Sequence, residues 1–81
     1  MAIRISEVIG IPTSRRHDIE AAVIAGGQHT SKLHRASIVA DPFSGWNVFI
    51  TGPGNQKRFI SFWANEGPTA ITAEISAALN E

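Results

Sequence analysis

The side chains best suited to metal or acid–base chemistry are three histidines, His17, His29 and His34. His29 and His34 are five positions apart, and a zinc site would need a third ligand such as Asp18 to come close through folding. Histidine pairs without cysteine and without a tight spacing motif rarely bind metal. We therefore predict no metal ion and no other cofactor.

The hydroxyl and carboxyl side chains form no catalytic pattern. No serine lies in a G-x-S-x-G nucleophile elbow, and His17 and Asp18 are adjacent on an expected helix, where their side chains diverge. The seven acidic residues are dispersed, without the pairing that acid and base roles require. A chain this short also shows no second layer that would form a cleft, so we expect a protein that is not an enzyme.

Length and composition predict one small domain, residues 1–81. Seven basic and seven acidic residues give a formal net charge of zero, so affinity for nucleic acid or membrane must come from a local patch. Cysteine is absent, the N-terminal residues lack the features of a signal peptide, and no run is long enough to span a membrane. These features predict a cytoplasmic protein.

Two segments have helical spacing. The first is expected over 14–25, with Thr13 or Ser14 as N-cap, apolar residues three to four positions apart, and Gly26-Gly27 at its end. The second follows Pro68, with Thr69 as a plausible cap. Its apolar stripe is Ile71, Ile75, Ala78 and Leu79.

Three segments between these helices are rich in β-branched and aromatic residues, namely 34–40, 45–51 and 57–64, and turn-forming residues separate them. The predicted fold class is α+β, in the order αβββα, with a three-stranded antiparallel sheet and two helices packed on one face. Residues 1–12 form an N-terminal arm. Its apolar residues Ile3, Ile5, Val8 and Ile9 indicate either an extra edge strand or a short helix.

The strand register follows from requiring that apolar residues share a face, because a shift of one residue turns every side chain over. Five-residue loops then pair Phe49 with Phe59 and Val48 with Ile38 and Ile60. One face becomes a wholly apolar core surface: Ala36, Ile38, Ala40, Trp46, Val48, Ile50, Ile60 and Phe62. The other face is polar and basic around an aromatic centre: Arg35, Ser37, Val39, Asn47, Phe49, Thr51, Lys57, Phe59, Ser61 and Trp63.

This second face admits three interpretations. The ring pair Phe49–Phe59 stabilises the hairpin by itself, or the arm, residues 2–9, folds over the rings as a second small core. In the third, the face binds a partner through Phe49, Phe59, Trp63, Arg35, Lys57 and Asn47. Our leading hypothesis is a small non-catalytic protein-binding or regulatory module, with a second copy of the chain among its candidate partners.

Nucleic acid is the alternative partner. Unpaired bases can stack on rings that lie beside Lys or Arg on a sheet, and the loop 26–32 could form an anion patch. The basic residues available for that patch are Arg15, Arg16, Lys32 and Arg35. A third hypothesis is a phage or mobile-element inhibitor that docks on a larger complex, because such proteins are typically short chains without cofactor motifs.

The order of elements over residues 14–80 resembles the double-stranded RNA-binding domain. The resemblance implies RNA contacts from the start of the first helix, from the loop 41–45 and from the start of the last helix. Arg15, Arg16 and His17 suit the first contact. The loop 41–45 has no basic residue or histidine, and Glu66 lies where that family has lysine.

Overall fold

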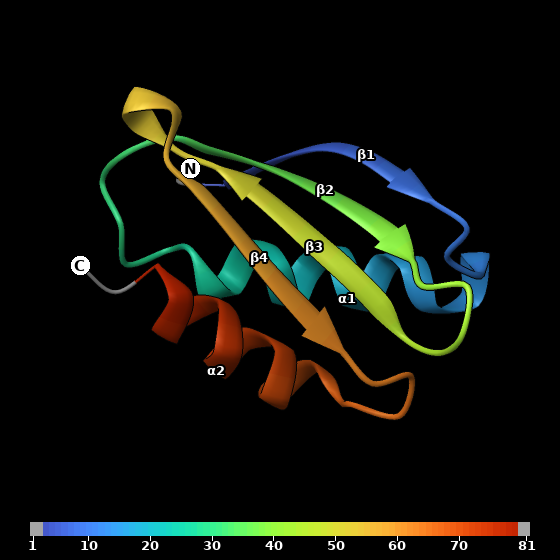
Figure 1. Ribbon diagram of the computed structural model, residues 1–81. Coiled ribbons are helices and arrows are strands. Elements are labelled where there is room, and N and C mark those ends of the chain that lie inside the picture. The colour runs from blue at the N-terminus through green and yellow to red at the C-terminus, as the bar shows by residue number, and fades with distance from the viewer. Residues whose placement is uncertain (1–2, 80–81) are drawn as a thin grey trace.

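The computed structural model describes residues 3–79, which form a four-stranded sheet with two helices on one face (Figure 1). The α+β fold class is as predicted, with the arm as a fourth strand. The sheet order is β1-β2-β3-β4. In chain order the elements are β1 (Ile3–Ile9), α1 (Thr13–Gly26), β2 (His34–Ala40), β3 (Trp46–Thr51), a 3-10 turn η1 (Pro53–Asn55), β4 (Lys57–Phe62) and α2 (Pro68–Ala78).

The predicted register of the antiparallel strands is confirmed. Val48 of β3 lies opposite Ile38 of β2 and Ile60 of β4, and Phe49 lies opposite Phe59. The two five-residue loops therefore set the pairing as expected, because side chains alternate faces with a period of two.

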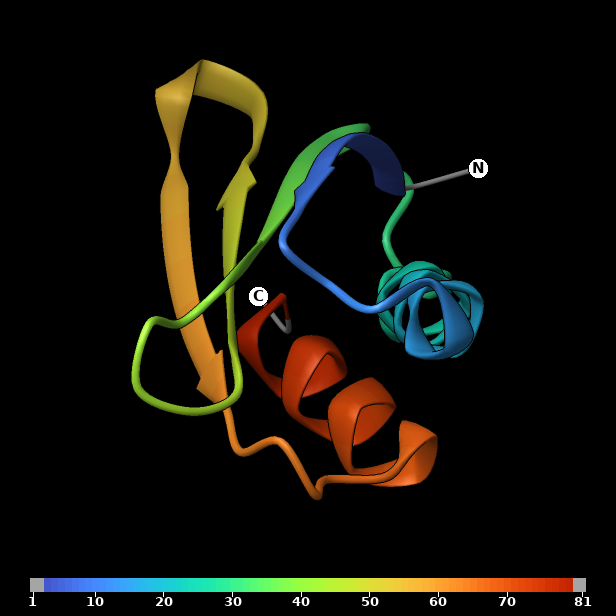
Figure 2. The same cartoon turned by 90° about the vertical axis from the view of Figure 1, so that its right-hand side faces the viewer.

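The core lies between the sheet and the helices. Figure 2 shows α1 and α2 on the same side of the sheet, and no helix or strand of residues 3–79 on its other side. The expected core residues are buried, except Ala40 and Ile60, which are half-buried. Each fully buried aliphatic or aromatic side chain contributes about 1.5–3 kcal/mol. The helices supply Ile19, Ala22, Val23, Ile71, Ile75 and Leu79.

The N-terminal arm is an edge strand, β1, which runs parallel to β2. Ile3 and Ile5 face the core beside His34 and Ala36, and then an extra residue, Ser6, shifts the register. The Ser6 hydroxyl donates to the carbonyl oxygen of Ala36 at 3.1 Å. This bulge sends Val8 to the core face and leaves Glu7 exposed, where strict alternation would have pointed the carboxylate inward.

The interpretation in which the arm covers the aromatic rings does not hold for the described residues 3–9. A strand satisfies its backbone hydrogen bonds along one edge of the sheet, so β1 lies in the plane of the sheet and not over its face. Residue 2 lies outside the described part of the chain.

The helix ends differ from the expected caps. Pro12 precedes α1 and its carbonyl oxygen accepts the N–H groups of Arg15 and Arg16, while no side chain caps the helix. Gly67 holds the N-cap position of α2, so Thr69 lies within the first turn and does not cap it. Both helices begin beside a proline, whose preset φ suits a helix start.

Candidate binding surface

The centre of the uncovered sheet face is the ring pair of Phe49 and Phe59. Their centroids are 5.0 Å apart and the ring planes are tilted by 51°. Phe49 is 45% exposed and Phe59 is 59% exposed, although each lies beside buried residues in its own strand or in the partner strand. We call the side of the sheet that no helix covers the open face.

A row of basic side chains crosses the open face beside the rings. Arg4 pairs with Arg35, Arg35 pairs with Thr51, and Thr51 pairs with Lys57, so one residue from each of the four strands lies in this row. We call Arg4, Arg35 and Lys57 the cation row. Arg35 and Lys57 were expected here. Arg4 was not predicted. The alternation of Ile3, Arg4 and Ile5 is the signal that points Arg4 away from the core once these residues form a strand.

The cation row is unpaired within the described residues 3–79. None of its three side chains forms an ion pair or a side-chain hydrogen bond there. Beside it, a hollow of about 660 Å³ is lined by Lys32, Leu33, Arg35, Thr51, Gly52, Pro53 and Asn55. Lys32 thus adds a fourth positive charge at this end of the open face.

The opposite end of the open face is polar and acidic. The Asn47 amide donates to Asp41 Oδ2 at 3.1 Å, and the Ser61 hydroxyl donates to Asn47 Oδ1 at 2.9 Å. The Phe43 N–H donates to Asp41 Oδ1 at 2.9 Å. The hydrogen bonds from Phe43 and Asn47 lower the pKa of Asp41 below its usual range, because they favour the carboxylate.

This acidic end also holds a second hollow, of about 310 Å³. Phe43 and Trp63 contribute to its lining, and they are 96% and 69% exposed. Asp41, Asn47 and Ser61 contribute polar atoms to the same hollow. Asn47 therefore acts first as an internal link between the loop 41–45 and β4, while Trp63 is free for contact.

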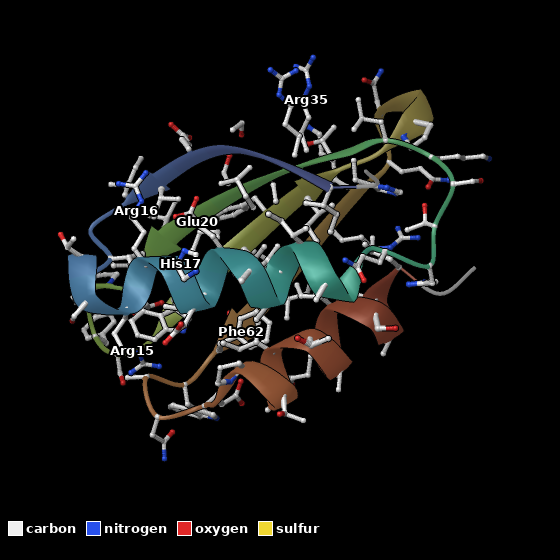
Figure 3. The ribbon with its side chains drawn as sticks, turned by 180° about the vertical axis from the view of Figure 1, so that it is seen from behind. Arg15, Arg16, His17, Glu20, Arg35 and Phe62 are labelled. Carbon is white, nitrogen blue, oxygen red and sulfur yellow. The ribbon has the colours of Figure 1, made fainter. Side chains whose placement is uncertain are left out.

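The four residues of the alternative basic patch do not lie together. Arg15 and Arg16 lie at the start of α1, whereas Lys32 and Arg35 follow its other end, about 20 Å away for a helix of this length. Figure 3 shows Arg15 and Arg16 well apart from Arg35. Arg15 lies over the Trp46 ring at 5.3 Å, and Arg16 pairs with Glu20 at 3.1 Å. The charge of Arg15 is thus engaged with a core ring, and the charge of Arg16 with an acid on the same helix.

Among residues 3–79, the three histidines do not form a common site. His34 is buried in β2, and its Nδ1 donates to the carbonyl oxygen of Lys32 at 2.9 Å. His17 and His29 are exposed. Among residues 3–79, no three histidine or acidic side chains gather in a way that could hold a metal ion.

Of the regions named by the resemblance to the double-stranded RNA-binding domain, the starts of the two helices lie on the helix side of the sheet, whereas the loop 41–45 borders the acidic end of the open face. Just before α2, burial raises the pKa of Glu66, and the neighbouring Glu74 adds to the rise. Glu66 precedes the N-cap residue Gly67, so an acid lies beside the helix start that would have to hold phosphates, which disfavours a phosphate contact there.

Comparison with known protein families, curated proteins and solved structures gives no match for this chain. Over residues 3–79, neither helix combines the length and the apolar character needed to cross a membrane.

Proposed function

We propose that this chain is a small non-catalytic binding module that holds a macromolecular partner on its open face. The observation that carries the proposal is the exposure of the Phe49–Phe59 pair at the centre of a face that no helix or strand of the described residues covers. Contiguous exposed apolar groups with a polar rim are typical of interaction sites.

The surroundings of the rings support the same proposal. The cation row lies on one side of them, and Trp63 with the second hollow lies on the other. Large rings supply contact area at a low cost in side-chain entropy, and flanking charges orient a partner. A protein, a second copy of the chain and a single nucleic-acid strand are all candidate partners for such a face.

The test compares Phe59→Arg with Ala73→Arg, a matched control on the exposed side of α2. Partners captured from a cell lysate are identified as protein or nucleic acid, and sedimentation of the purified chain measures self-association. We expect wild type and Ala73→Arg to retain the partner and Phe59→Arg to lose at least about tenfold in affinity.

Recovery of the same partners with both variants would contradict the proposal. Circular dichroism checks that Phe59→Arg is folded. If it is not, Lys57→Glu replaces it, because an exposed side chain at the end of β4 can change charge without disturbing the core.

A further inference from the structure

We propose that the partner held on the open face is a single strand of nucleic acid, with its phosphates on the cation row and its bases stacked on Phe49, Phe59 and Trp63. This inference rests on the proposed binding role of the same face and specifies the partner. Aromatic platforms beside basic side chains are how proteins hold unpaired nucleotides without sequence preference.

The placement of the charges favours a polyanion. Arg4, Arg35 and Lys57 make no ion pair within residues 3–79, so their charges are free for a ligand. Among the described strand residues that point to the open face, Glu7 is the acidic one. It lies on β1, three strands away from Phe59. The neutral total charge of the chain therefore conceals a positive strip along one end of the sheet.

The spacing between the cation row and the rings matches a nucleotide. Phe49 lies two residues before Thr51 in β3, and Phe59 lies two residues after Lys57 in β4, on the same face, so the rings are about 7 Å from the cation row along the strands. A base that stacks on the rings thus places its own phosphate near the cation row. At the opposite end, Asp41 repels phosphate, while the hollow beside Trp63 presents a ring with amide and hydroxyl groups to a second base.

The size of the open face suits a short single strand. Four strands about 4.8 Å apart and about 20 Å long cover roughly 400 Å² in projection. Roughly four nucleotides, at the low end of known site sizes, fit within this area.

The experiment is fluorescence anisotropy with labelled single strands of about eight nucleotides, oligothymidylate and oligouridylate, at salt concentrations from about 20 to 200 mM. A double-stranded RNA of mixed sequence is the third probe. We expect both single strands to bind, with a slope of log K against log salt of about −2, since three phosphates contribute about −0.7 each. The relative affinity of the two strands shows whether DNA or RNA is preferred.

Variants assign the binding to the open face. Arg4→Gln, Arg35→Gln and Lys57→Gln should each reduce the slope by about 0.7. Phe49→Ala and Phe59→Ala should each weaken binding roughly tenfold with the slope unchanged, because stacking is not ionic. Arg16→Gln is the matched control, since it removes the same charge from α1 and should leave binding unchanged.

Three results would overturn the inference: no binding of either strand at the lowest salt, an unchanged slope in all three cation-row variants, or equal binding of the duplex. If the strands do not bind but Phe59→Arg still abolishes capture of a protein or self-association, the nucleic-acid inference fails and the binding role of the face stands. If Phe59→Arg changes nothing in either experiment, both proposals fail.

Discussion

Phe49 of β3 and Phe59 of β4 lie directly opposite each other on the open face, with ring centroids 5.0 Å apart. Each ring keeps about half of its surface in contact with solvent. A pair with this geometry both steadies the β3–β4 hairpin and remains available to a ligand, because offset or tilted rings leave part of each face free.

The structural part of that role is measured by a double-mutant cycle with Phe49→Ala and Phe59→Ala. We expect each variant to lower the free energy of unfolding by about 1 kcal/mol, with a coupling of about 0.5–1 kcal/mol. Urea unfolding provides the values. Ile38→Ala, at a fully buried position of β2, should cost about 2–5 kcal/mol in the same assay. A comparable loss for Phe59→Ala would mean that the rings are part of the core.

Asp41 makes stability depend on pH. Because hydrogen bonds from Phe43 and Asn47 lower its pKa in the folded state, the carboxylate stabilises the fold above its ordinary pKa of 3.8. This contribution is lost as the pH falls through the lower folded-state pKa. At pH 7, Asp41→Ala should therefore lower the melting temperature by a few degrees. The difference from wild type should shrink as the pH falls below 3.8.

Asp18→Ala is the control for that experiment, since Asp18 is exposed on α1 and its side chain takes part in no hydrogen bond within residues 3–79. Thermal melts of both variants at several pH values make the comparison. A constant difference between Asp41→Ala and wild type from neutral to strongly acid pH would show that the charge of Asp41 is not what stabilises the loop.

Gly45, before β3, has no room for a side chain. Its φ is +78°, a conformation that other residues rarely adopt, and an added Cβ would collide with the carbonyl oxygen of Phe62. Gly45→Ala should therefore lower the free energy of unfolding by about 3 kcal/mol or more. Gly67→Ala, where an added Cβ meets open space and φ is −83°, should change it by less than about 1 kcal/mol. Equal effects in chemical denaturation would contradict this account of the turn.

Much of the open face was predictable from local sequence. Two five-residue loops and a period of two set which side chains of β2, β3 and β4 point outward, and the structure confirms that Phe49, Phe59, Arg35 and Lys57 share a face. Their role in binding stays a prediction. The helices were equally predictable, because apolar residues four positions apart, such as Ile71, Ile75 and Leu79, form one side of a helix, and that side packs into the core.

The sequence by itself therefore determined the two hairpins, both helices and the composition of each face of the antiparallel strands. The tertiary structure alone decided that β1 runs parallel to β2, that the Ser6 bulge keeps Glu7 out of the core, and that Arg4 completes the cation row. It also decided that Arg15 and Arg16 lie far from Arg35. The physical reason is that a hairpin register is set by its own short loop, whereas a parallel pairing across α1 has no such loop and is chosen by the packing of the whole core.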